Sequence, residues 1–533
     1  MSLHWADQLA EKIIERAHRD KIIPNIKCQQ TPSGGKHIGN LNDVMRAYFP
    51  YKAVIERGEK CTFVHTTDDR DPLKDIPAKL ADLDANWHDA AKFPELKKFY
   101  GKPLVTVPDP FGCCSSYASH FTEVWMRGLE EIGVKPELHS VDDLYKKKKF
   151  EPYVKMVFEK REQAGKIVSD LQATKDTSYI PFDVFCPQCG GLSNVDDFDL
   201  EKKTVHFVCG GKEIKKKKSE GCGEEGWAPW TQGKLQWRFE WPALMCIFNT
   251  TFEPFGKDHA EGSWKSVLRI MPEIFNREPP IPFVYEFFLV NGEKMSASKG
   301  NVYVVQDMLK IMEPEPFKFY YVKRPEKQRD LDLNKIFQLV DEFDAAEQSF
   351  FGIGDEKSEN REENNKRMYE LTMSTIAKNA PTRVSFSFCG QLSQLMSVDD
   401  AVAKLKELGH VKTKEDVELV KRRLVVARQW VQLYGAEHKI VISTSSFARE
   451  QKEKLSPSQR SALSQFAVTL KKETTADETQ QMTAVREICK ENKIQINDFF
   501  AAAYGVLINK PRGPKLYTLI SVIGREKAIE LLT

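Results

Sequence analysis

The 533-residue chain lacks both a long hydrophobic run and an excess of charge of either sign. No stretch of about 18 consecutive apolar residues occurs, so we expect no membrane span. The opening, MSLHWADQLAEKIIERAHRD, has neither a basic start nor an unbroken apolar core, so it predicts an amphipathic helix and no signal peptide. We therefore expect a cytoplasmic protein. The net charge is only +2, so overall charge gives no argument for nucleic acid.

The sequence also lacks a repeat of fixed period and an even set of cysteines. Its 11 cysteines, without an export signal, argue against a disulfide framework. Four lie at positions 186, 189, 209 and 222, and two are adjacent at 113 and 114. We interpret the other five as small core residues. Two lysine runs, Lys146–Lys149 and Lys215–Lys218, are each best interpreted as solvated faces when taken alone.

The first part of the chain has the pattern of a parallel α/β unit. Residues 22–30 predict a strand, 31–40 (TPSGGKHIGN) a polar loop, and the following segment a helix with Asn40 as N-cap and an interruption or kink at Pro50. KCTFVHTTDD predicts a second strand that ends in a polar loop. Ligands of parallel sheets lie at the carboxyl ends of strands, where TPSGGKHIGN and TTDDRD fall.

Composition changes along the chain predict five parts. Residues 1–140 and 236–325 are the two halves of one α/β domain, and 141–235, rich in lysine, glycine and cysteine, interrupt it. Residues 326–365 include an exposed linker. Residues 366–533 have helical periodicity and predict an all-α domain.

Two loops carry the residue types that a transferring phosphoryl or adenylyl group needs. Glycines 34, 35 and 39 allow close backbone approach to a ligand, and the following helix start suits an anion. A histidine in that loop can donate to a phosphoryl oxygen. The second loop, KMSASKGN, offers mobile cationic and hydroxyl donors at Lys294, Ser296, Ser298 and Lys299.

These motifs resemble those of class I aminoacyl-tRNA synthetases. HIGN at 37–40 resembles the HIGH signature of that class, and KMSAS at 294–298 resembles its KMSKS signature. HWAD, VPDPFGCCSSYASHF, WRFEWP, FEPFGKDH and the C-terminal YGVLINKPRGPKLYTLISVIGREKAIELL together resemble the class I lysyl-tRNA synthetase family. The resemblance is nearly end to end and is weak between about residues 350 and 490. It implies a Rossmann-type catalytic domain with a zinc-containing insertion, a stem-contact region at 326–365, and an all-α C-terminal anticodon-binding domain.

The resemblance implies roles residue by residue. For catalysis it implies His37, Lys294, Ser296 and Ser298. For ATP it implies Gly35, His37, Gly39, Asn40, Gly256, Asp258, Lys294 and Lys299. For the amino acid it implies Gln29, Thr31, Asp43, Asp68, Trp237, His259 and Tyr285, whose rings and carboxylates suit an alkyl chain with an ammonium head. Two positions depart from the family pattern: Gln29 replaces a glycine, and Asp43 replaces a glutamate.

Two clusters of metal-ligating residues are predicted. Cys186, Cys189, Cys209 and Cys222 form a C-x2-C pair and a split second pair, and they favour a structural zinc. In the family the second pair of ligands lies close together in the sequence, so the resemblance implies that the lysine-rich stretch between Cys209 and Cys222 is an insertion into the zinc-binding loop. Asp109, Cys113, Cys114 and His120 are four competent ligands within 12 residues, and some family members bind a metal in this stretch.

The sequence therefore predicts a lysine–tRNA ligase that uses ATP with Mg²⁺ and one or two zinc ions, acts on lysine and tRNA(Lys), and is monomeric. Three alternatives stay open: a synthetase for another amino acid, a tRNA-independent adenylyltransferase, and a non-catalytic RNA-binding protein. Both signature loops argue against the last. We also hypothesise that the lysine-rich insertion contacts tRNA.

Overall fold

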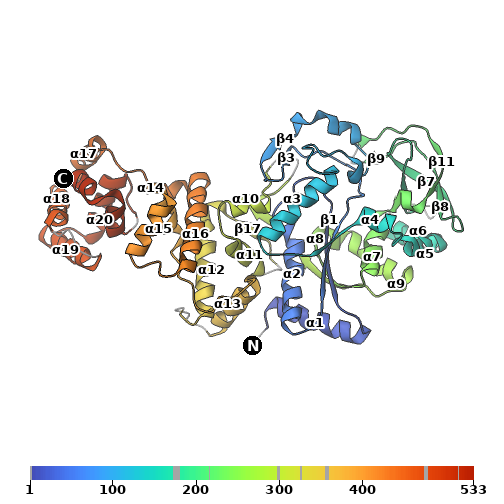
Figure 1. Cartoon of the computed structure of the whole chain (residues 1–533), viewed down its shortest axis with the longest axis horizontal. Helices are drawn as coiled ribbons and strands as arrows, with labels where there is room; N and C mark the ends of the chain where they lie inside the picture. Colours follow the sequence, from blue (N-terminus) through green and yellow to red (C-terminus); the bar gives the residue numbers. More distant parts are fainter. Residues whose placement is uncertain are drawn as a thin grey trace. The chain divides into compact units, whose positions relative to one another are not determined.

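The computed structural model describes residues 3–171, 180–214, 217–296, 301–323, 327–353, 359–472, 478–513 and 515–533. The chain forms two compact units (Figure 1). The first unit comprises Met1–Leu309, Pro314–Leu333 and Ala345–Ile376; the second comprises Lys310–Glu313, Asn334–Asp344 and Ala377–Thr533. None of the described helices has both the length and the apolar character needed to cross a membrane. The finer five-part division remains a prediction.

A five-stranded parallel sheet forms the centre of the first unit, which confirms the predicted α/β class. Its first two strands in the sequence are neighbours, with Asn25 paired to Thr62 and Gln30 to Thr67. Their polar loops therefore leave the sheet at the same edge. In spatial order the strands are β14 (Ile281–Tyr285), β13 (Thr250–Gly256), β1 (Asn25–Gln30), β2 (Thr62–Thr67) and β5 (Glu137–Ser140).

The helix after the glycine loop, α2 (Leu41–Glu56), differs from its prediction in two ways. It begins after Asn40 as expected, but the Asn40 side chain makes no capping bond. It also continues through Pro50, so of the two predicted outcomes, a kink or an interruption, the interruption is wrong. Proline removes one helical hydrogen bond. The continuous burial of residues 44–50, with packing against β1 and β13, offsets that loss.

The remaining helices of the first unit include the predicted amphipathic N-terminal helix, which buries Ala6, Leu9, Ala10, Ile13 and Ala17. The helices are α1 (Trp5–Asp20), α3 (Tyr117–Glu131), α4 (Val141–Lys146), α5 (Glu151–Glu159), α6 (Arg161–Leu171), α7 (Trp237–Ile247), α8 (Lys257–Glu261), α9 (Ser263–Glu273), α10 (Val305–Leu309), α11 (Pro314–Val322) and α13 (Glu359–Thr372). A further helix, α12 (Ile336–Phe350), belongs partly to each unit.

The insertion between β5 and α7 carries its own antiparallel sheet. Its strands, in spatial order, are β11 (Glu225–Pro229), β8 (Thr204–Val208), β7 (Leu192–Asp199), β6 (Phe182–Phe185) and β12 (Gly233–Leu235). A short hairpin, β9 (Glu213–Ile214) and β10 (Lys217–Lys218), lies between β8 and β11 in the sequence and packs Ile214 against Phe185 and Leu192. The insertion shares one hydrophobic core with α7 and α9, so it is packed into the first unit.

Two small sheets flank the signature loops. Strands β15 (Phe288–Val290), β16 (Glu293–Lys294) and β17 (Arg329–Leu331) form one of them, and β16 leads directly into the KMSAS loop. Strands β3 (Lys79–Ala81) and β4 (Trp87–Asp89) form a hairpin.

The described residues of the second unit form helices and no strands, which confirms the predicted all-α C-terminal region. Arg423 is 2% exposed and joins its parts, because its guanidinium donates to Glu313 Oε1 and to both oxygens of Asp344. The helices are α14 (Phe386–Leu395), α15 (Val398–Glu407), α16 (Lys414–Leu433), α17 (Ser445–Glu453), α18 (Pro457–Lys472), α19 (Glu478–Glu491), α20 (Ile496–Ile508), α21 (Leu516–Ile523) and α22 (Arg525–Leu532).

Candidate active site at the carboxyl edge of the parallel sheet

The loops after β1 and β2 meet at the carboxyl edge of the sheet. The Asp68 backbone N–H donates to Gln30 O at 2.8 Å, and the Thr31 hydroxyl donates to Asp68 Oδ2 at 3.4 Å. Asp68 is 3% exposed, and burial raises the pKa of its carboxyl well above the usual range. Its Oδ1 has no partner among the described residues. The two loops thus bring Thr31 and Asp68 into contact at the edge where the sequence predicts both loops, and Asp68 Oδ1 is an acceptor without a hydrogen bond among the described residues.

His37 is oriented by the loop that carries it. The Gly39 backbone N–H donates to His37 Nδ1 at 3.1 Å, so the neutral ring carries its proton on Nε2. Burial, with Lys36 and Lys294 nearby, lowers the pKa of His37 to about 4. A Cβ on Gly39 would lie 2.9 Å from the imidazole, so the ring position requires glycine there. The arrangement provides an uncharged N–H donor.

The second signature loop lies against the first. The Ile38 N–H donates to Tyr303 O at 2.8 Å, and Met295 Cε lies 3.1 Å from where a Cβ of Gly39 would be. Asn301 ties the loop's two ends: its side chain accepts from Ser296 N at 2.9 Å and donates to Lys294 O at 3.3 Å.

Lys294 is exposed, and its Nζ lies 3.7 Å from the centroid of the Phe287 ring. Ser298 and Lys299 lie outside the described residues.

Asp43 and Tyr285 form the centre of the predicted amino-acid pocket. The Tyr285 hydroxyl donates to Asp43 Oδ1 at 2.5 Å. Burial raises the pKa of Asp43 to about 7; the bond from Tyr285 opposes this rise, and the charges of Glu253 and Asp258 add to it. A buried carboxyl in an acidic environment favours a cationic ligand, because the ligand's charge replaces the proton.

The GKDH segment and helix α7 supply the other wall. A Cβ on Gly256 would lie 2.7 Å from Asp258 Oδ1, so glycine is needed beside that carboxylate. Trp237 stacks on Trp241 with centroids 5.5 Å apart, and its ring centroid lies 6.0 Å from that of His259. The Trp237 indole N–H donates to Ser263 Oγ at 3.2 Å.

The sequence reasoning missed a buried ion pair behind this pocket. Lys27 Nζ donates to Glu253 Oε1 at 2.8 Å and to Gln29 Oε1 at 2.7 Å. Lys27 and Glu253 are 0% and 1% exposed, and Trp241 Nε1 donates to the same Glu253 oxygen. The available signal was a lysine between Ile26 and Cys28 in a strand that forms the middle of the sheet. Gln29, the departure from the family pattern, is thereby connected to the aromatic wall.

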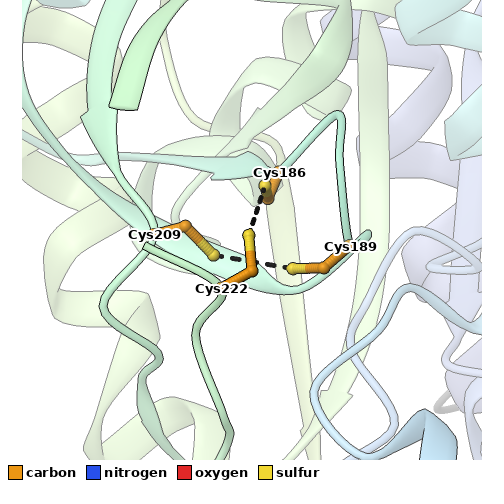
Figure 2. A group of neighbouring side chains, drawn as sticks. All are labelled: Cys186, Cys189, Cys209 and Cys222. Atoms are coloured by element: carbon orange, nitrogen blue, oxygen red, sulfur yellow. Dashed lines mark hydrogen bonds between the residues drawn. The ribbon is translucent and has the colours of Figure 1, made fainter. Parts of the chain in front are cut away.

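The four cysteines of the insertion point toward a common centre (Figure 2). Their sulfurs lie within 4.8 Å of one another, with 3.6 Å between Cys186 and Cys222 and between Cys189 and Cys209. The hairpin explains how Cys209 and Cys222, with 12 residues between them, come together: Gly223 N donates to Cys209 O at 3.0 Å across its base. Four convergent thiols fit a tetrahedral zinc.

The second cluster also converges. The ligand atoms of Asp109, Cys113, Cys114 and His120 lie within 4.8 Å of one another. His120 Nδ1 lies 3.2 Å from Cys113 Sγ and from Asp109 Oδ1, whereas Nε2 lies 2.9 Å from Ala81 O. That carbonyl fixes the proton on Nε2 and leaves Nδ1 as a ligand, the arrangement expected of a metal-binding histidine.

Fold and loops define a nucleotide-binding α/β protein joined to a helical unit, and comparison with known proteins narrows the class. The profile described as tRNA synthetases class I (K) matches residues 3–375, and one described as Anticodon binding domain matches 388–532. The chain therefore belongs to the class I tRNA synthetases (K).

Curated relatives match the chain nearly end to end. Lysine–tRNA ligases of Natronomonas pharaonis and Haloarcula marismortui are each 36% identical, over 99% of this chain and 96% of theirs. That of Methanocaldococcus jannaschii is 32% identical over 99% of both chains. A glutamate tRNA ligase structure from Elizabethkingia meningosepticum covers 96% of this chain and 98% of its own at 12% identity, but its TM-score of 0.43 is too low to support an inference.

Proposed function

We propose that the chain is a lysine–tRNA ligase. It activates lysine with ATP to give lysyl-adenylate and pyrophosphate, and it then transfers the lysyl group to the terminal adenosine of tRNA(Lys). The observation that carries the proposal is the half-buried Asp43–Tyr285 pair, which lies in an acidic pocket beside Glu253 and Asp258. An ammonium group matches this environment, whereas a neutral or acidic side chain does not.

The activation step needs positioning and charge stabilisation rather than a general base. The carboxylate of lysine is already an ionised nucleophile, and negative charge grows on the α-phosphate oxygens as it attacks. Neutral His37 donates from Nε2 to these oxygens without titrating near neutral pH. Lys294, with Ser296, Ser298 and Lys299, supplies cationic and hydroxyl donors from the KMSAS loop.

ATP, with Mg²⁺ on its phosphates, occupies the glycine loop and the GKDH segment. Gly35 and Gly39 let the backbone approach the nucleotide, Asn40 precedes the helix start, and Gly256 with Asp258 holds the ribose. Gly39 and Gly256 support this assignment, because a side chain at either would collide with His37 or Asp258.

Lysine recognition divides between two carboxyls. Asp43, fixed by Tyr285, meets the ε-ammonium, and Trp237 with His259 covers the methylenes. Asp68, with its open Oδ1 and its contact to Thr31, meets the α-amino group. Gln29 lines the pocket and is held by Lys27.

The two ligand clusters hold structural zinc. Cys186, Cys189, Cys209 and Cys222 close the insertion, and Asp109, Cys113, Cys114 and His120 close the segment before α3. Neither cluster includes residues of the signature loops, so neither ion takes part in the chemistry. Loss of zinc from Cys222→Ser, measured as metal per chain, tests the first assignment.

The second unit reads the anticodon through a cavity of about 680 Å³. Aromatic, amide and cationic side chains line it, including Phe500, Tyr517, Gln481 and Arg512. Gln481 is 6% exposed and its Oε1 has no partner among the described residues, which supports a hydrogen bond to a base edge. Aromatic stacking with amide and guanidinium donors is how unpaired bases are recognised.

The remaining assignments follow from these roles. Residues 1–140 and 236–325 carry catalysis, 141–235 form the connective insertion, 326–365 contact the tRNA stem, and 366–533 bind the anticodon. The protein acts as a monomer in the cytoplasm, where its substrates are. The lysine-rich hairpin contacts tRNA, although Lys212 is already paired with Asp183 at 2.5 Å. Unchanged tRNA affinity and unchanged salt dependence of that affinity after deletion of residues 212–219 would contradict the contact between the hairpin and tRNA.

Exchange of labelled pyrophosphate into ATP tests the proposal, with the twenty amino acids supplied one at a time and without tRNA. Exchange with lysine alone is the expected result. Exchange with another amino acid would retain the synthetase class and overturn the specificity. If no amino acid supports exchange, the assay is repeated with tRNA. Absence of pyrophosphate exchange with tRNA present would overturn the catalytic assignment.

A further inference from the structure

Trp87, at the start of strand β4, contacts two segments of the first unit: the glycine loop at 31–40 and residues 303–307, which follow the KMSAS loop. A Cβ on Gly35 would lie 3.1 Å from Trp87 Cη2 and 3.4 Å from Val304 Cγ1, so the indole packs directly on the glycine loop. The Trp87 indole N–H donates to Asp307 Oδ2 at 2.9 Å. The same oxygen accepts from the Val304 N–H at 3.1 Å. One side chain therefore bridges the glycine loop and the segment that follows the KMSAS loop.

The strand opposite Trp87 is held by the second ligand cluster. Ala81 is the cross-strand partner of Trp87 in the β3–β4 hairpin. His120 Nε2 donates to Ala81 O at 2.9 Å, and His120 is fully buried. Phe111 adds a second connection, since it stacks on His120 and meets His88, the neighbour of Trp87, edge to face. The cluster is thus connected to Trp87 through the hydrogen bond from His120 to Ala81 and the pairing of Ala81 with Trp87.

We propose that Trp87 is a positioning residue for ATP, and that the Asp109–Cys113–Cys114–His120 cluster sets the position of Trp87. The indole holds the glycine loop and residues 303–307 at a fixed separation, so that both loops reach the nucleotide together. A zinc ion on the cluster would hold the His120 ring, and through Ala81 the hairpin, in place. The proposal rests on the proposed function in one respect, namely that these loops bind ATP.

The contact explains why the position before Lys36 is glycine. A side chain at Gly35 would meet the Trp87 ring, and the loop would have to move away from residues 303–307. The bond between Ile38 N and Tyr303 O and the contact of Val304 with Gly35 also link the two segments, beside the bridge through Trp87. Replacing Trp87 by phenylalanine removes the indole N–H that bonds Asp307 and also the ring atoms that pack on Gly35, so it breaks the bridge at both ends.

The test uses full-length Trp87→Phe and measures ATP binding by titration calorimetry in the absence of lysine. We expect the Kd for ATP to rise about tenfold, the loss typical of a hydrogen bond to a charged acceptor. The KM for lysine should stay unchanged, a split that general misfolding does not produce. Trp227→Phe is the matched control, because Trp227 is 52% exposed on the insertion sheet and contacts neither loop segment.

Asp307→Ala, which removes the acceptor, and the double variant keep the proposal falsifiable if Trp87→Phe folds poorly. Because Asp307 acts on the glycine loop through the indole, the double variant should weaken ATP binding no more than the weaker-binding of the two single variants. Additive losses, or an unchanged Kd in both single variants, would overturn the positioning role. Hydrogen exchange at residues 303–307 should rise in the same variants without nucleotide.

Cys113→Ser/Cys114→Ser tests the role of the cluster. We expect one zinc fewer per chain, faster hydrogen exchange in the β3–β4 hairpin, and weaker ATP binding, with no further weakening when Trp87→Phe is added. Loss of zinc with unchanged hairpin exchange and ATP affinity would overturn the link to the cluster. Pyrophosphate exchange by the wild-type protein distinguishes failure of this inference from failure of the proposed function. If no amino acid supports pyrophosphate exchange, the proposed function fails, whereas the ATP-binding measurements still test the role of Trp87.

Discussion

The two candidate recognition sites use opposite physical means. The pocket at the sheet edge is built from ionisable groups, with Asp68 and the Lys27–Glu253 pair buried and Asp43 half-buried. The cavity of the second unit is built from aromatic rings, amides and basic groups such as Phe500 and Arg512. Charge is costly to bury, so it serves to select a small cation that can compensate it. A base offers a flat ring and hydrogen-bonding edges, for which rings and amides are sufficient.

The first prediction concerns the buried Lys27–Glu253 ion pair behind the amino-acid pocket. Lys27→Met leaves Glu253 without its cation, and we expect a loss of about 3–5 kcal/mol in the free energy of unfolding. Urea denaturation measures it. Lys27→Met/Glu253→Gln should recover most of the loss, because no uncompensated charge remains. If the double variant is as unstable as the single one, packing rather than charge explains the effect.

The second prediction concerns the carboxyl that meets the ligand. Asp43→Asn keeps an acceptor for the Tyr285 hydroxyl and removes the negative charge. We expect the KM for lysine in pyrophosphate exchange to rise on the order of 100-fold, as when a buried charge pair loses one partner. The KM for ATP should stay within about twofold of the wild type. The exposed Asp84→Asn is the control, and equal lysine KM values in the two variants would contradict the assignment.

The third prediction separates the two sites. Phe500→Leu and Arg512→Ala should each reduce the kcat/KM for tRNA charging about 10- to 100-fold, because stacking or a guanidinium contact to a base is lost. Lysine-dependent exchange without tRNA should be unchanged. Arg449→Ala, an exposed arginine on α17, is the control. A parallel loss of exchange would show that the two sites are not independent.

The smallest effect is expected from pH. Asp43 has a pKa of about 7, raised by burial from 3.8, so the free enzyme carries a proton there at and below neutral pH. Lysine needs the ionised form, so binding releases that proton. The KM for lysine should increase as pH falls, about tenfold from pH 8 to pH 6. Asp43→Asn should have a flat profile over this range; an unchanged slope in that variant would assign the proton to another group.

Local patterns in the sequence were sufficient for much of the site. Strand, polar loop and helix at 22–56 predicted both the parallel sheet and the edge at which Thr31 and Asp68 meet. The resemblance to the family pointed to Cys209 and Cys222 as the second ligand pair despite the intervening lysine run, and the structure brings their sulfurs together with those of Cys186 and Cys189. The capping role of Asn40 was wrong in its side-chain bond, and α2 runs through Pro50 because packing outweighs one missing hydrogen bond.

The sequence by itself determined the elements, the order of the two signature loops and the candidate ligand sets, because each depends on residues close together in the chain. Tertiary structure alone decided which distant groups became partners. Lys27 meets Glu253 from 226 residues away, and Trp87 meets Asp307 from 220 residues away. No local pattern encodes such pairs, since burial and strand order bring the groups together. Those same factors raise the pKa of Asp43 and keep His37 neutral.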